Sequence, residues 1–133
     1  MKPPSGKTST RTKGAAAEAF ARRLLEEAGY RVVEMNARTP LWELDVIAWD
    51  EDTLCFIEVR STKDLAFGGP LATVGADKRR RVVRGARAWL AHHETAPPAR
   101  PWPPAVRFDV LGIWGEDGAR QHELVRGAFD AGG

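Results

Sequence analysis

Cysteine is nearly absent from this sequence, since Cys55 is the only one among 133 residues. No disulfide can therefore form within the chain, and because Cys55 lies inside an apolar run we expect it in the core. Long apolar stretches are also missing: none approaches the roughly 20 residues that a membrane-spanning helix needs, and the N-terminus lacks the apolar centre of a secretory signal. We therefore expect a cytoplasmic protein with no membrane segment.

Acidic residues are missing from two segments, although the formal charge of the whole chain is only +2. Residues 1–13 carry four basic side chains and no acid, and the rest of the chain outside the second segment has more acids than bases. The second segment, 78–87, also has no acid and carries six basic residues: Lys78, Arg79, Arg80, Arg81, Arg84 and Arg87. Basicity so localised favours a polyanion such as DNA as the partner, with these six residues as its contacts. A solvated helix face and a free tail are the alternative.

Apolar periodicity predicts an α/β sandwich in which helices cover a mixed sheet. We expect a disordered basic tail at 1–13 and a single domain at 14–131. Helices are predicted at about 14–28 and 75–94, and strands at about 30–35, 42–49, 53–60, 106–114 and 121–126. The segment 95–104 contains five prolines and is expected to be an extended connection.

The predicted hairpin at 42–60 places acids on otherwise apolar strands. Alternation lets Asp45 on its first strand and Glu58 with Arg60 on its second point to the same side. A carboxylate there is costly to bury unless a cation, a hydrogen-bond donor or a proton balances it. Mg²⁺ or Mn²⁺ takes hard oxygen ligands and often only one or two carboxylates, so Asp45, Glu58 and the carbonyl of Val59 are predicted metal ligands. A pair of acids neutralised by Arg60 is the alternative.

A divalent ion beside a phosphate suits phosphodiester cleavage, because it supplies positive charge and lowers the pKa of a bound water. Asp45, Glu58 and Arg60 are then the candidate catalytic residues. Glu18, on the first predicted helix, is a further candidate as a water-mediated ligand or orienter. An ordinary exposed glutamate is its alternative.

An ordered series of short motifs extends this interpretation over nearly the whole chain. The chain resembles the bacterial YraN family of uncharacterised, endonuclease-like proteins within the PD-(D/E)XK nuclease superfamily. The resemblance implies a restriction-endonuclease-like fold, with Glu18, Asp45 and Glu58 as metal-site candidates. It rests on Ala17-Glu18, Gly29-Tyr30, Asn36-Ala37-Arg38, Glu43-Leu44-Asp45, Phe56-Ile57-Glu58-Val59, Phe67-Gly68 with Pro70, Lys78, Arg107-Phe108-Asp109-Val110 and Ala128-Phe129.

Three positions depart from the family pattern: Trp42 stands where it has glycine, Arg60 where it has lysine, and Thr62 where it has arginine. Arg60 matters most, because a guanidinium stays protonated and cannot act as a general base. It could still neutralise a phosphate, and Lys63 or Lys78 could replace the missing lysine. The sequence thus predicts a metal-dependent DNA endonuclease that prefers branched or nicked DNA, or else a nucleic-acid-binding module of the same fold that has lost cleavage.

Overall fold

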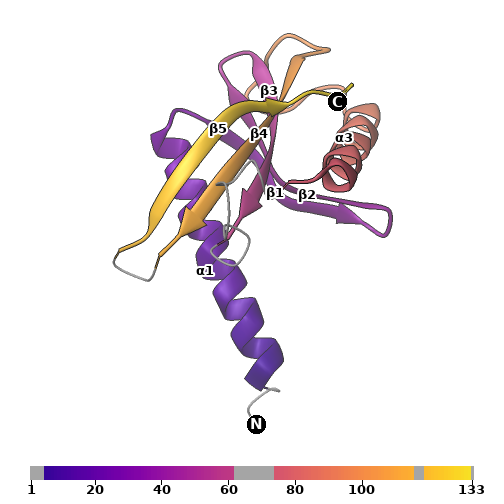
Figure 1. The fold of residues 1–133 in the computed structure, drawn as a ribbon. Helices are drawn as coiled ribbons and strands as arrows, with labels where there is room; N and C mark the ends of the chain where they lie inside the picture. The colour runs from indigo at the N-terminus through magenta and orange to yellow at the C-terminus, as the bar shows by residue number, and fades with distance from the viewer. Residues whose placement is uncertain (1–4, 62–73, 116–118, 133) are drawn as a thin grey trace.

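The computed structural model describes residues 5–61, 74–115 and 119–132, which form a five-stranded mixed sheet with helices packed against it (Figure 1). Neighbouring strands follow the order of the sequence; β3 and β4 are parallel, and the other neighbouring pairs are antiparallel. The elements are α1 (Ser5–Glu27), β1 (Arg31–Thr39), β2 (Trp42–Asp50), β3 (Thr53–Arg60), α3 (Ala76–Ala91), β4 (Ala105–Trp114) and β5 (Gln121–Phe129). This architecture confirms the predicted α/β class and fits a restriction-endonuclease-like sandwich.

Three elements are longer than predicted. Helix α1 begins at Ser5, so residues 5–13, which we expected to be a disordered tail, are helical here. No proline interrupts the sequence between Pro4 and Pro40, so nothing in it prevents the extension. Strand β1 continues to Thr39 instead of giving way to a loop after Met35, because β2 pairs with it along its length. Strand β5 likewise continues to Phe129. The division into a tail and a single domain stays a prediction.

Two apolar cores lie on the two faces of the sheet, because successive strand residues point to opposite sides. On β3, Phe56 belongs to the core shared with α3, which includes Val82, Ala86 and Trp89. The preceding Cys55 belongs to the other core, which includes Leu25 of α1. Cys55 is fully buried, as expected for a core residue. The alternation seen in the sequence therefore decides which helix each strand residue contacts.

Helix α3 approaches the sheet closely at Gly85. A Cβ atom at this position would lie 3.2 Å from Leu44 Cδ2 and 3.3 Å from Trp42 Cβ, both on β2. Trp42, which the family resemblance marked as a bulky departure, packs against the core under α3. The absence of a side chain at Gly85 thus makes room for Trp42 and brings α3 close to the hairpin.

The segment 95–104 contains no helix or strand, as its prolines indicate. The predicted loop at 64–70, together with Thr62 and Lys63, lies outside the described residues. Within the described ranges, no helix is both long enough and apolar enough to cross a membrane.

Candidate metal and nucleic-acid site

Asp45 and Glu58 meet at the point where β2 and β3 stop pairing. The ladder between these strands runs from Asp50 opposite Thr53 to Val46 opposite Ile57. Asp45 and Glu58 are the next residues along the two strands. The backbone N–H of Val59 donates a hydrogen bond to the carboxylate of Asp45, with 2.8 Å between N and Oδ2. The Asp45 side chain therefore takes a backbone donor that the ladder no longer uses.

Two cations approach the same oxygen of Glu58. Arg60 Nη1 lies 3.2 Å from Glu58 Oε2, and Lys78 Nζ lies 3.4 Å from it. Glu58 itself is only 4% exposed, so these contacts are poorly screened by water. Lys78 arrives from the first turn of α3, twenty positions further along the chain. The sequence suggested that Lys78 could replace the missing lysine, but only the fold brings it to the acids.

The two carboxyl groups are harder to ionise than usual. Burial, partly offset by the Val59 N–H, raises the pKa of Asp45. Burial and the nearby charge of Asp45 raise the pKa of Glu58 to about 7, although Lys78 and Arg60 act in the opposite direction. Burial thus disfavours the ionised forms of both acids even though Arg60 and Lys78 lie beside Glu58. A bound divalent cation would favour these ionised forms.

A small cavity beside Asp45 brings in two further oxygen-bearing side chains. It has a volume of about 120 Å³, and Glu18 of α1 and Asn36 of β1 line it together with Asp45. Asn36 lies between two residues of β1 that pair with the neighbours of Asp45, because Met35 pairs with Val46 and Ala37 with Leu44. The structure therefore brings Glu18, an exposed residue on α1, to the cavity that Asp45 lines.

Sequence reasoning did not select Asn36 as a site residue. The sequence feature that could have pointed to Asn36 is its place in the motif Asn36-Ala37-Arg38. The structure adds that its backbone φ is 53°. Asparagine tolerates this left-handed conformation better than most residues, because its short side chain can hydrogen-bond locally. The unusual φ and the shared cavity together make Asn36 a candidate ligand or orienter.

The donor set suits a hard cation with few protein ligands. Among the described residues, no group of three or more histidines, cysteines, aspartates or glutamates is arranged to hold a metal ion. Asp45 and Glu58 supply two carboxylates, and Asn36 and the carbonyl of Val59 could add neutral oxygens. Mg²⁺ and Mn²⁺ are commonly held in this way, with waters and substrate oxygens completing the shell.

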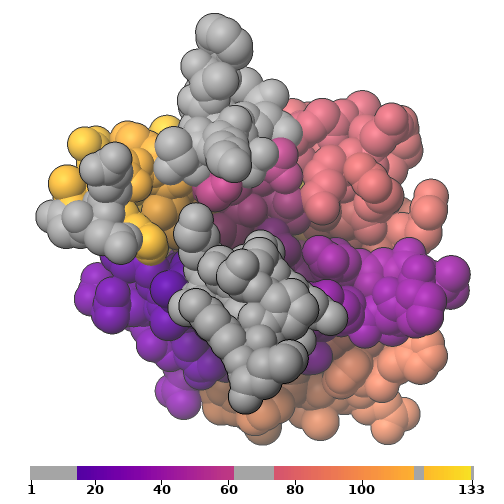
Figure 2. Space-filling view, turned by 90° about the horizontal axis from the view of Figure 1, so that it is seen from below, coloured from indigo at the N-terminus to yellow at the C-terminus, as the bar shows by residue number. Residues whose placement is uncertain are grey.

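The six basic residues predicted to bind nucleic acid do not form one uniform surface. Lys78 lies at the acids, and Arg80 is paired with Asp77. The Nε of Arg79 donates to the Val74 carbonyl at 2.8 Å, and its guanidinium lies 5.7 Å from the ring centre of Phe129. The remaining three, Arg81, Arg84 and Arg87, are exposed along α3. Figure 2 shows the face of the molecule at which β3 ends. On this face, β3 lies between α3 and the β4–β5 pair.

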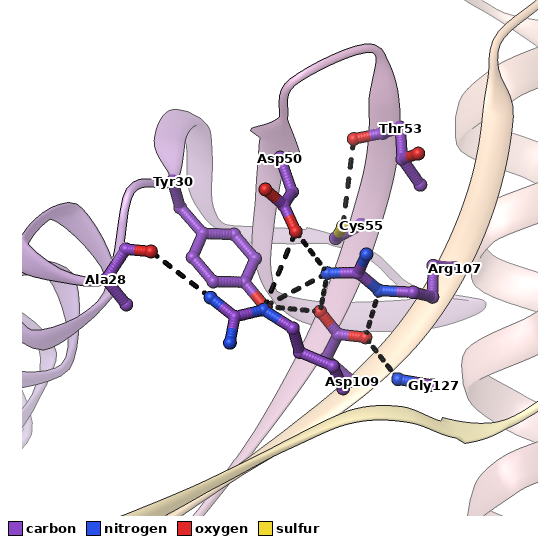
Figure 3. Close-up of polar contacts among 9 residues, drawn as sticks. Ala28, Tyr30, Asp50, Thr53, Cys55, Arg107, Asp109 and Gly127 are labelled. Carbon is purple, nitrogen blue, oxygen red and sulfur yellow. Dashed lines mark hydrogen bonds and ion pairs between the residues drawn. The ribbon is translucent and has the colours of Figure 1, made fainter.

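A second buried acid, Asp109, belongs to a separate network (Figure 3). Its Oδ2 accepts a hydrogen bond from the Tyr30 hydroxyl at 2.6 Å, and its Oδ1 accepts from Arg107 Nε at 2.8 Å and from the Gly127 N–H at 2.9 Å. Burial alone would raise the pKa of Asp109, but these donors outweigh it and lower the pKa. Arg107 Nη2 also reaches Asp50 Oδ2 at 2.8 Å. Both carboxylate oxygens of Asp109 therefore have hydrogen-bond donors, and its role is structural.

Comparison with known proteins finds relatives that match most of this chain. A model of the uncharacterised protein family UPF0102 matches residues 17–113. A UPF0102 protein of Paracidovorax citrulli is 42% identical over 130 residues, covering 95% of this chain and 88% of the relative. A UPF0102 protein of Desulfosudis oleivorans is 38% identical over 118 residues, or 89% of each chain. The matched stretch contains Glu18, Asn36, Asp45, Glu58, Arg60 and Lys78.

Proposed function

The chain belongs to the uncharacterised protein family UPF0102, and from its acid site we propose that it is a Mg²⁺- or Mn²⁺-dependent DNA endonuclease. One observation carries the proposal: Asp45 and Glu58 adjoin where β2 and β3 separate, and Lys78 Nζ lies 3.4 Å from Glu58 Oε2. Two carboxylates able to hold an ion, with a lysine ammonium beside them, are a set of groups suited to metal-assisted phosphodiester hydrolysis.

Asp45 and Glu58 would hold the ion, with oxygens of Val59 and Asn36 near it and Glu18 reaching it through water. When bound, the ion would supply positive charge to the scissile phosphate and acidity to a water. The pKa values of both carboxyl groups, raised by burial, support this assignment, because a cation favours their ionised forms.

Lys78 and Arg60 have different parts in the proposed reaction. A guanidinium cannot act as a general base, whereas the amine of a lysine can do so where a bound cation would offset the charge of the neighbouring carboxylates. We assign to Lys78 the role of the lysine that the resemblance places at position 60, which is to orient the attacking water or accept its proton. Arg60 neutralises the phosphate. Replacement of the usual lysine by Arg60 then need not abolish cleavage.

DNA shape rather than base sequence is the proposed basis of recognition. Arginines on an exposed helix face contact phosphates readily, and phosphate contacts position a protein without reading bases. Branched or nicked DNA differs from ordinary duplex in the path of its backbone. We therefore propose branched or nicked DNA as the preferred substrate.

A cleavage assay tests the activity. Purified protein is incubated with supercoiled plasmid, a four-way junction and a nicked duplex in the presence of Mn²⁺. Wild type should cleave, Asp45→Ala and Glu58→Ala should not, and Glu26→Ala should behave like wild type because Glu26 is exposed on α1 and pairs with Arg22. Cleavage that persists in both site variants would reject the site.

The second candidate function is a nucleic-acid-binding module that no longer cleaves. It is favoured by the contacts of Glu58, whose carboxylate already has Arg60 and Lys78 beside it and could be a closed ion-pair cluster. Thermal unfolding separates the two readings independently of activity. Mn²⁺ should raise the Tm of wild type and not of Asp45→Ala if the ion binds. DNA binding with neither cleavage nor a Mn²⁺-dependent rise in Tm would support the module.

A further inference from the structure

A groove lies between α3 and the C-terminal end of β5, away from the acids. Its volume is about 590 Å³. Most of its lining side chains are apolar, and they come from three elements: Val83 and Leu90 of α3, Val106 and Phe108 of β4, and Phe129 of β5. Val106 is 38% exposed, which is unusual for a large apolar side chain in this protein.

Arginines border this apolar floor. An adjoining hollow of about 430 Å³ shares Val83, Arg87 and Ala131 with the groove, and Arg80 and Arg84 complete its basic side. Asp130 is the acid that lines the groove, and Asp77 pairs with Arg80. The balance of charge along the edge is therefore positive, while the floor is apolar.

Helix α3 connects the groove to the acid site. Lys78 in its first turn contacts Glu58, and Arg87 of the same helix lines the groove. The nine positions from Lys78 to Arg87 correspond to about 14 Å along the helix axis and to about half a turn around it. A polyanion that leaves the acids would therefore have to cross to the other side of α3, past Arg84, and would arrive at the groove after a few nucleotides.

We infer that this groove holds an unpaired segment of the DNA substrate, with its bases against the apolar floor and its phosphates on the arginines. This inference rests on the proposed function, and it names the substrate class: DNA that carries single-stranded nucleotides beside the cleaved bond. Proteins that bind single strands combine these same two features, a basic track for the backbone and apolar or aromatic surface for the bases.

Duplex DNA does not use such a groove, because its bases are stacked and paired inside and its phosphates face outward. A duplex would gain from the arginines but not from Val106, Leu90 or the phenylalanines. An acidic peptide with apolar side chains could satisfy both features, so the experiment includes one. The proposed occupant is the unpaired strand, because the same helix that borders the groove leads to the acids.

Fluorescence anisotropy without divalent ions tests the inference on the full chain. Four labelled probes are compared: a mixed-sequence 20-mer single strand, a strand of the same length with abasic sites throughout, the corresponding duplex, and an acidic amphipathic peptide. Wild type should bind the single strand on the order of tenfold more tightly than the abasic strand, since only the former has bases to bury.

Two matched pairs of variants locate the contact. Val106→Gln should reduce the preference for the strand with bases to about twofold or less, whereas Leu41→Gln should not, because Leu41 is 85% exposed in the turn between β1 and β2. Arg87→Gln should weaken binding of both strands, whereas Arg81→Gln should change it less than about twofold. Arg81 lies about 120° round α3 from Arg87 and does not line the groove.

Equal affinity of wild type for the abasic strand and the strand with bases would overturn the inference, because only phosphates would then be bound. Binding of the acidic peptide but of no strand would also overturn it and would assign the groove to a protein partner. In either case, cleavage of branched DNA that is lost in Asp45→Ala would leave the proposed endonuclease standing. If the protein neither binds the strands nor cleaves DNA, both the inference about the groove and the proposed endonuclease activity are rejected.

Discussion

Lys78 and Arg60 contact the same carboxylate oxygen of Glu58, yet only one of them can lose its proton. Arg60 lies two residues from Glu58 on β3, whereas Lys78 reaches it from another element. The chemistry of each side chain therefore decides its role more than its place in a motif. At the scale of single residues, the proposed mechanism depends on this difference.

Exchanging the two cation types gives a direct test. Lys78→Arg retains the charge and removes the labile proton, so we expect the cleavage rate to fall by about 10²-fold or more while DNA affinity changes little. Arg60→Lys retains the charge at the phosphate and should keep most of the activity. Rates are measured on the branched substrate under single-turnover conditions. Full activity in Lys78→Arg would show that Lys78 is not the proton-transfer group.

The raised pKa of Glu58 predicts that the stability of the protein depends on pH. Its pKa of about 7 in the folded protein lies above the value near 4.3 expected in the unfolded chain. The folded state therefore binds this proton more tightly, so the contribution of Glu58 to the free energy of unfolding is fully present near pH 4.5 and falls by about 3 kcal/mol as the pH rises to 7. Asp45 is the acid paired with Glu58, and Glu43, Arg60 and Lys78 are the other charged groups that act on the two.

Urea unfolding of wild type and Glu58→Gln between pH 4.5 and 8 measures this contribution. The variant should lose the part of the dependence that Glu58 contributes, because glutamine does not titrate. Asp45, whose pKa is also raised, remains and acts in the same direction. Asp109, whose pKa is lowered, changes its charge below this range and so does not mask the effect. Identical slopes for the two proteins would mean that Glu58 is ionised throughout.

At the scale of elements, the network around Asp109 joins segments that are distant in the sequence. Tyr30 precedes β1, Arg107 and Asp109 lie on β4, and Gly127 lies on β5. Arg126 of β5 also donates to the carbonyl of Ala28 at 3.1 Å and lies 5.2 Å from the ring centre of Tyr30. This network fixes the end of α1 against the β4–β5 edge of the sheet.

Removing members of the network should destabilise the fold in a graded way. Asp109→Ala leaves Arg107 without its buried partner and should lower the free energy of unfolding by about 3–5 kcal/mol. Tyr30→Phe removes one hydrogen bond to a charged group and should lower it by about 2 kcal/mol. Arg22→Ala, which breaks an ion pair with both side chains half exposed, is the control and should change it by less than about 1 kcal/mol.

Equal effects of these three substitutions in urea unfolding would contradict the assignment of Asp109 to a structural network. Activity offers a second readout. Tyr30→Phe should still cleave DNA at temperatures where it is folded, because neither Tyr30 nor Asp109 contacts Asp45 or Glu58.

At the scale of the whole molecule, charge is divided between an acid site and a basic helix face. Two of the six basic residues at 78–87 are engaged with acids, namely Lys78 with Glu58 and Arg80 with Asp77. If the other four each neutralise one phosphate of duplex DNA, the logarithm of the binding constant should fall against the logarithm of salt concentration with a slope of about −4.

The double variant Arg84→Gln/Arg87→Gln should make this slope shallower by about 2, while Arg22→Gln on α1 should leave it unchanged. The slope is obtained from duplex binding titrations at several salt concentrations, without divalent ions. A double variant with the wild-type slope would show that DNA does not lie along this face of α3.

The sequence by itself determined the chemistry of the hairpin. Asp45 and Glu58 adjoin because residues 42–60 form two neighbouring antiparallel strands, and strand periodicity is a local property that apolar alternation reveals. The positive charge of α3 was equally evident, because consecutive basic residues on one helical segment need no tertiary information to be recognised.

Only the tertiary structure decided which distant groups join the acids. Strands β3 and β4 are parallel, so the chain must cross over between them, and the connection containing α3 begins where β3 ends. That crossover delivers Lys78 to Glu58, just as β1–β2 pairing delivers Asn36 to Asp45. Such contacts depend on how elements pack against one another, which the spacing of residues along a single element does not encode.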